Sequence, residues 1–149
     1  MVAQLETDKT HALNLATAAL LVEISRADNH VSDSERATII EAMRKSFGLD
    51  ELEARELVQL ADRAADRAVS LTEFTRLLNQ NLTQEDRVSI VQSLWQVANA
   101  DTDIDMYEEY YVRKIADLLY VSHSEFIRTK LRVIEDKAEL IAISERDRS

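Results

Sequence analysis

Apolar residues recur along this chain at the spacing of an α-helix, and short polar segments separate the apolar runs. Directly before most runs stands a Ser, Thr or Asp, followed three residues later by Glu or Asp. The first side chain can cap an unpaired amide of the first helical turn while the later acid reaches back, so each pair predicts a helix start. The pairs are Ser32 with Glu35, Asp50 with Glu53, Ser70 with Glu73, Thr83 with Asp86, Asp105 with Glu108, and Ser122 with Glu125.

These starts, with an apolar run near the N-terminus, predict seven helices. We expect them at about 7–27, 33–46, 51–66, 71–80, 84–100, 106–119 and 123–143, with a helix stop at Gly48 and a frayed tail over 146–149. One glycine and no proline leave little material for the tight turns of a β-sheet. The sequence therefore predicts an all-α fold, and its length suits a single multihelical domain over 1–149.

The helices expected at 7–27 and 84–100 differ from the others because apolar residues cover almost their whole circumference. A helix that is apolar all round is typically buried. We therefore expect these two helices to form a central pair, with the amphipathic helices packed around them.

An internal repeat explains why the chain has two helices that are apolar all round. Shifting the chain by 73 residues aligns Ala27-Asp28 with Ala100-Asp101 and Glu35 with Glu108, and apolar positions fall on apolar positions. Self-similarity of this kind indicates a duplicated helix-loop-helix unit. The two halves cover roughly 10–66 and 84–143.

The repeated acids are the candidate functional residues. The Asp of each half falls in the last turn of a helix, where the helix dipole disfavours a carboxylate, and the Glu falls in the first turn of the next helix. Two interpretations stay open: a structural one, in which the acids cap helices and bond loop amides, and a site for a hard divalent cation such as calcium, magnesium or manganese. The predicted ligands are Asp28, Glu35, Asp101, Asp103, Asp105 and Glu108.

The second loop is the stronger candidate, because five acids lie between positions 101 and 109 with no base among them. An EF-hand is excluded there, since Met106 and Val112 stand where that loop needs a glycine and a bidentate Glu.

Other chemistries find little support in the sequence. There is no cysteine, no signal-peptide pattern and no apolar run long enough to cross a membrane, so we expect a cytoplasmic protein. The net charge of −10 argues against nucleic acid and favours cations or basic protein surfaces as partners. We expect the three histidines to lie at the surface, and Trp95 and the Tyr107, Tyr110, Tyr111 cluster to serve in core and interface packing.

The segments Ala27-Asp28-Asn29-His30-Val31 and Ala100-Asp101-Thr102-Asp103-Ile104-Asp105, each followed by Glu, resemble the tellurite-resistance TerB-like family. The later segments Arg113–Leu119 and Val121-Ser122 resemble its uncharacterised bacterial branch, and the likeness covers roughly residues 10–135. The resemblance implies an all-helical fold with two central helices and an acidic, metal-binding surface. It also implies a part in stress or tellurite response, with protein partners in membrane-associated assemblies.

Two functions of different class follow. The first is a non-catalytic binding or scaffold module with an acidic face that binds a divalent cation. The alternative is a metal-assisted enzyme that uses the clustered carboxylates. The sequence favours the first, because no base or nucleophile accompanies the acids.

Overall fold

The computed structural model of the chain describes residues 2–26, 32–66, 71–100, 104 and 106–148. These residues form helices and short connections, and no strand occurs among them, which confirms the all-α prediction. The helices are α1 (Val2–Ser25), α2 (Asp33–Phe47), α3 (Glu51–Asp66), α4 (Leu71–Asn81), α5 (Gln84–Ala98), α6 (Met106–Leu118) and α7 (His123–Arg148).

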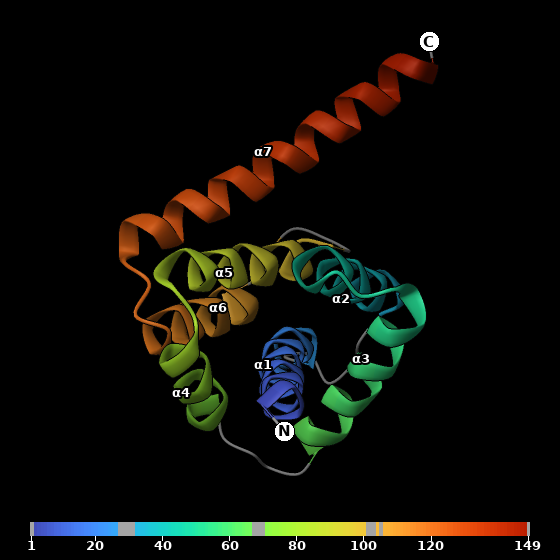
Figure 1. The fold of residues 1–149 in the computed structure, drawn as a ribbon. Coiled ribbons are helices and arrows are strands. Elements are labelled where there is room, and N and C mark those ends of the chain that lie inside the picture. The colour runs from blue at the N-terminus through green and yellow to red at the C-terminus, as the bar shows by residue number, and fades with distance from the viewer. Residues whose placement is uncertain (1, 27–31, 67–70, 101–103, 105, 149) are drawn as a thin grey trace.

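Helix α1 is the centre of the fold. It packs against α2, α3, α4, α5 and α6, and Figure 1 looks along it with these helices arranged around it. Helix α5 packs against α1, α2, α6 and α7, and its Leu94 and Trp95 are fully buried. The predicted central pair is therefore confirmed, because the two helices that are apolar all round are the ones with neighbours on most sides.

The two halves of the chain share part of their packing. Helices α1, α2 and α3 correspond to α5, α6 and α7, since α1 packs against α2 and α3 as α5 packs against α6 and α7. The close packing of α2 on α3 has no counterpart between α6 and α7 among the described residues. Gly48 follows α2 in the left-handed conformation, as predicted, with φ of 63°. The residue 72 positions later, Tyr120, follows α6 with φ of 56°. The duplication thus extends to the backbone conformation that ends the second helix of each half.

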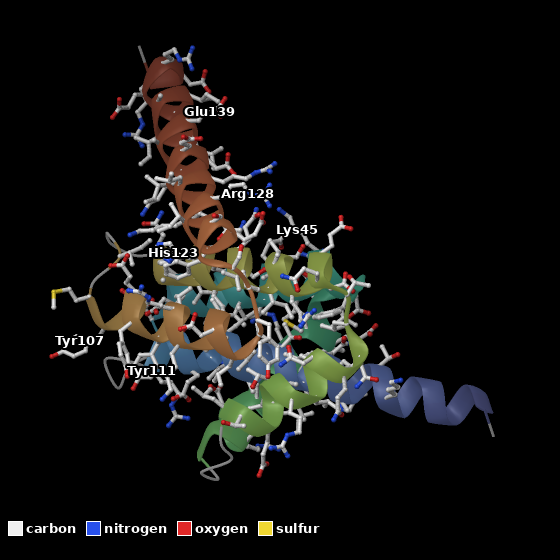
Figure 2. The ribbon with its side chains drawn as sticks, turned by 90° about the vertical axis from the view of Figure 1, so that its left-hand side faces the viewer. Lys45, Tyr107, Tyr111, His123, Arg128 and Glu139 are labelled. Carbon is white, nitrogen blue, oxygen red and sulfur yellow. The ribbon has the colours of Figure 1, made fainter. Side chains whose placement is uncertain are left out.

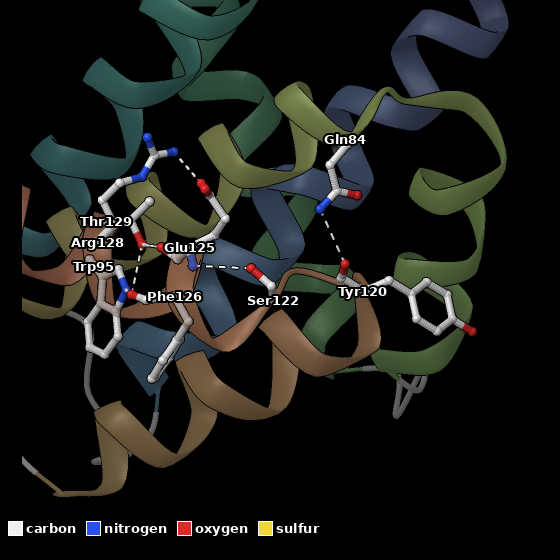
Figure 3. A network of polar contacts seen from close by, with 8 residues as sticks. All are labelled: Gln84, Trp95, Tyr120, Ser122, Glu125, Phe126, Arg128 and Thr129. Atoms are coloured by element: carbon white, nitrogen blue, oxygen red, sulfur yellow. Dashed lines mark hydrogen bonds and ion pairs between the residues drawn. The ribbon is translucent and has the colours of Figure 1, made fainter.

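The predicted helix starts are formed wherever the structure describes both residues of a pair and its cap. Ser32 with Glu35 and Thr83 with Asp86 make complete capping boxes. Asp50 accepts the amide of Glu53 at 2.8 Å, and Ser122 accepts the amide of Glu125 at 3.2 Å (Figure 3). Ser70 and Asp105 lie outside the described residues.

Two predicted helix limits are wrong. Helix α1 begins at Val2, five residues before the expected start, and α7 runs to Arg148 in place of the frayed tail expected over 146–149. The last stretch of α7 holds no glycine or proline, and Ala, Glu and Arg, which have high helix propensity, recur along it. As a result α7 crosses α5 and then extends away from the other helices (Figures 1 and 2).

Candidate functional site

The predicted carboxylate ligands are only partly covered by the structure. Asp28, Asp101, Asp103 and Asp105 lie outside the described residues, so their assignment stays a prediction. Glu35 and Glu108 lie in the first turns of α2 and α6, at equivalent positions of the repeat. Among the residues that the structure describes, no group of three or more His, Asp or Glu side chains could hold a metal ion.

Glu35 has the geometry of a capping residue. Its Oε1 accepts the backbone amide of Ser32 at 3.2 Å, and its own amide donates to Ser32 Oγ at 3.1 Å. The side chain is buried, with 6% of the residue exposed. This is the contact expected from the structural interpretation, and a role of Glu35 in cation binding remains a prediction beside it.

Helix α7 brings two lysines to the flanks of the acid-rich segment 101–109. Lys130 Nζ lies 2.5 Å from Oε1 of Glu109 and 5.4 Å from the centroid of the Trp95 ring. Lys137 Nζ donates to the backbone oxygen of Asn99 at 2.7 Å. Positive charge therefore stands at both ends of a segment that has no base of its own.

Sequence reasoning missed these lysines because they are distant along the chain. Lys130 is 21 residues from Glu109, and Lys137 is 38 residues from Asn99. The expected core position of Trp95 was the available signal, because the apolar stem and the ammonium group of a lysine can pack over an indole ring. The Trp95 Nε1 in turn donates to the backbone oxygen of Phe126 at 3.2 Å, which fixes the start of α7 on α5 (Figure 3).

A cavity of about 400 Å³ lies beside the two lysines. Asn99 and Ile104 line it from the end of α5 and the segment that follows. Apolar side chains of α7 complete the wall, namely Ile134, Ala138 and Ile141. The second half therefore combines a hollow with two ammonium groups next to its acidic segment.

Large side chains stand exposed where α6 begins. Met106 is 82% exposed, Tyr107 72% and Tyr110 61%, and Tyr107 projects outward in Figure 2. The expected core packing is confirmed for Trp95, which is buried, and for Tyr111, which packs against the core. Tyr107 and Tyr110 lie outside the core on the exposed face of α6, and their expected role in an interface stays a prediction.

The first half holds an ion pair of opposite polarity. Arg36, the repeat equivalent of Glu109, has its Nη2 2.9 Å from Oδ2 of Asp62 on α3. A base on the second helix of the first half thus faces an acid on the third, whereas in the second half Glu109 faces Lys130. The histidines His11 and His123 are exposed, as predicted, and His30 lies outside the described residues.

Comparison with known proteins identifies a family. The sequence profile described as tellurite resistance protein TerB matches residues 14–131, which covers α1 to the first part of α7. No match was found among curated proteins, and none among solved structures. Within the described part of the chain, no helix is both long enough and apolar enough to cross a membrane.

Proposed function

Starting from the TerB family of tellurite resistance proteins, to which this chain belongs, we propose that it is a non-catalytic binding module of a bacterial, cytoplasmic stress-response system. Its binding face is the segment from Asn99 to Tyr110 together with the lysines of α7. The ligands that we propose are a divalent cation at the acids of this segment and a protein with a basic surface, which includes proteins of membrane-associated assemblies.

One observation carries the binding role. Met106, Tyr107 and Tyr110 expose most of their surface directly after the acid-rich residues 101–105. Methionine and tyrosine are enriched in protein interfaces. The rigid ring of tyrosine gives contact area at low entropic cost, and the flexible methionine side chain adapts to the surface of a partner. Acids beside them complement a basic partner and raise its rate of association. We do not propose the enzymatic alternative, because no observation on the described residues favours it.

Calorimetric titration tests the cation. The metal-free full chain is titrated with calcium, magnesium, manganese and zinc, and we expect heat of binding from at least one of them. Asp101→Asn removes one anionic ligand from a small set and should weaken the binding at least tenfold. Asp117→Asn makes the same change at the opposite end of α6 and should leave the affinity unchanged.

The same two variants distinguish a cation site at Asp101 from the structural interpretation. If Asp101 binds a cation, Asp101→Asn should melt at the same or a higher temperature without metal, because repulsion among the acids is relieved. If Asp101 only bonds loop amides, the variant should lose about 1 kcal/mol of stability and ignore added cations. The second result would remove the cation from the proposed function.

A further inference from the structure

A small groove lies between the middle of α1 and the start of α3, two helices that pack directly on each other. Its volume is about 190 Å³. Pockets for drug-sized ligands hold roughly 300–1,000 Å³, so this groove suits a group no larger than one side chain. Four polar residues and three leucines line it, namely His11, Asn14, Glu53, Glu56, Leu49, Leu57 and Leu60.

Asn14 places the amide of its side chain at this groove. Only 7% of the residue is exposed, yet the side-chain amide forms no hydrogen bond with any other described residue. Among the described residues, every side-chain nitrogen or oxygen that is sealed from solvent has a hydrogen-bond partner. The amide of Asn14 is therefore not sealed, and the groove that it lines gives it access to solvent. Such an amide favours a polar ligand, because the ligand can supply the hydrogen bonds that the chain does not.

Glu53 and Glu56, one helical turn apart on α3, make the groove acidic. The pKa of Glu53 is raised by the hydrogen bond and charge of Asp50, by burial and by the charge of Glu56. All of these effects oppose the ionised form of Glu53. No lysine or arginine is among the described residues that line the groove, and Glu56 forms no ion pair with the described part of the chain. These residues thus give the two carboxylates no permanent cation.

The second half of the chain has bases at the equivalent positions. The repeat shifts α1 by 73 residues and α3 by 72, and it aligns Asn14, Glu56 and Leu60 with Arg87, Arg128 and Arg132. The acid at Glu53 is kept as Glu125, and Arg128 Nη2 forms an ion pair with Oε2 of Glu125 (Figure 3). The acid of the second half therefore has a guanidinium group beside it, and the described residues of the first half supply none.

From these observations we propose that the α1/α3 groove binds the side chain of an arginine from a partner protein. Glu53 and Glu56 accept its N–H groups, and the amide oxygen of Asn14 accepts one more. The leucines of the groove cover the apolar stem of the arginine. The groove is separate from the segment Asn99 to Tyr110, so this proposal does not depend on the cation or the partner proposed there.

The spacing of the polar groups favours a guanidinium group over a metal ion. A metal ion needs its ligand atoms about 2.0–2.6 Å from one point. Within the described ranges, no three His, Asp or Glu side chains are placed to hold one. A guanidinium group spreads five N–H donors around a plane, so it reaches acceptors that lie further apart. A lysine ammonium fits less well, because it is a compact and strongly hydrated point charge.

An arginine within a protein is favoured over the free amino acid. Free arginine carries a carboxylate of its own, which the acids of the groove and the net charge of −10 would repel. In a protein, peptide bonds replace that carboxylate, and the side chain keeps its positive charge.

NMR titration of the ¹⁵N-labelled full chain with N-acetyl-arginine amide tests the proposal. We expect saturable shifts of the Asn14 side-chain amide and of the backbone amides at the start of α3. N-acetyl-citrulline amide has the same shape without the charge and should bind about tenfold more weakly or less, because charge-assisted hydrogen bonds are lost. Free L-arginine should also bind more weakly than the capped form. Tenfold tighter binding of free L-arginine would overturn the assignment to a protein.

Variants of the groove supply the second measurement. Glu56→Gln should weaken binding of N-acetyl-arginine amide about tenfold or more, because one charged acceptor is lost. Asn14→Leu should also weaken binding, with a melting temperature that stays the same or rises, since the amide has no partner among the described residues. Glu139→Gln makes the same charge change on α7 and is the matched control, so it should leave the affinity unchanged.

Glu56→Arg tests the comparison between the halves. The variant places at this position the base that the second half has as Arg128, so its own guanidinium group should pair with Glu53 and abolish binding of N-acetyl-arginine amide. Its melting temperature should rise, because repulsion between the two acids is removed. Equal binding of the citrulline compound, unchanged affinity in Glu56→Gln, or loss of stability without loss of binding in Asn14→Leu would overturn the proposal.

Discussion

Tyr120 combines a left-handed backbone with a full side chain. The amide of Val121 donates to the oxygen of Ala116 at 2.9 Å, and that of Tyr120 to the oxygen of Asp117 at 3.1 Å, which is the Schellman pattern at the end of α6. Gln84 Nε2 also donates to the oxygen of Tyr120 at 3.3 Å (Figure 3). These bonds hold a conformation that residues with a Cβ avoid by about 1–2 kcal/mol.

Replacing the residues that end α2 and α6 should therefore change the stability of the fold in opposite directions. Tyr120→Gly relieves the backbone strain and should stabilise the fold by up to about 1 kcal/mol, after the entropic cost of glycine. Gly48→Ala meets no atom within 4 Å, so its cost is backbone strain alone, about 1 kcal/mol. Urea unfolding of both variants gives the two values. Destabilisation by Tyr120→Gly would mean that the exposed Tyr120 ring makes a contact worth more than the strain.

Two neighbouring acids at the start of α3 have pKa values that are shifted in opposite directions. Hydrogen bonds from the amide and side chain of Glu53 lower the pKa of Asp50, and the hydrogen bond and charge of Asp50 raise the pKa of Glu53. The contribution of Asp50 to stability is thus present above its ordinary pKa of 3.8 and is lost as the pH falls through its lowered value. The contribution of Glu53 to stability is present below its ordinary pKa of 4.5 and is lost as the pH rises through its raised pKa.

Asp50→Asn should bring the pKa of Glu53 down toward its ordinary value, because asparagine keeps the helix cap but removes the negative charge. Carboxyl ¹³C titration by NMR measures this shift directly. Asp33→Asn, at the start of α2, serves as the control and should not move the Glu53 titration. A Glu53 pKa that is unchanged in Asp50→Asn would contradict the assignment of its cause.

At the scale of elements, Lys130 joins three helices. It pairs with Glu109 of α6, stands over Trp95 of α5 and belongs to α7. Its side chain is only 24% exposed, whereas that of Glu109 is 43% exposed. Partial burial weakens screening by solvent, so this contact should contribute more than an ordinary surface ion pair.

A double-mutant cycle of Lys130→Met and Glu109→Gln measures the pair. Glu109→Gln keeps the length of the side chain and Lys130→Met shortens it by one atom, so the cycle reports mainly on the charge. We expect a coupling free energy of about 0.5–1 kcal/mol that falls as salt is added. The exposed pair Glu51 and Arg55 is the reference and should couple less, since both side chains are more than half exposed. A Lys130–Glu109 coupling near zero would show that Lys130 acts through its stem alone.

The elements also separate what local sequence predicts from what it does not. The caps at Ser32, Asp50, Thr83 and Ser122, and the stop at Gly48, depend on residues within a few positions of one another, and each was predicted. Lys130 and Lys137 reach their partners only through the packing of α7 on α5. No local pattern encodes that packing, and the conformation of Tyr120 could be inferred only by carrying Gly48 across the repeat.

The sequence predicted the location of the candidate site better than the contacts and exposure of its residues. The repeat places Glu35 and Glu108 at equivalent helix starts, as the structure has them. The capping bonds of Glu35 and the exposure of Tyr107 depend on which face of a helix meets the core. Helix α7 was predicted only to residue 143, because the last residues of the chain carry no apolar periodicity that would indicate packing. The exposure of Leu140 and Ile141 could not be predicted either, since an amphipathic stripe alone does not say what covers it.

At the scale of the whole molecule, the net charge of −10 should oppose compaction. We expect the melting temperature to rise by a few degrees between about 0.02 and 0.3 M sodium chloride, because salt screens the mutual repulsion of the acids. Choline chloride at equal ionic strength should give the same rise. A rise with magnesium at far lower ionic strength would instead indicate specific binding.

The reversed polarity of the two ion pairs has a consequence for how a duplicated chain assembles. Two similar halves risk mismatched docking during folding, with α2 beside α7 and α6 beside α3. Such a mispairing would break both ion pairs, because the repeat aligns Asp62 with Ile134 and Lys130 with Val58, and neither Ile134 nor Val58 carries a charge. The native arrangement makes both attractive. The inverted charges thus favour contact between the second and third helices of the same half. They disfavour an arrangement in which the third helices of the two halves are exchanged.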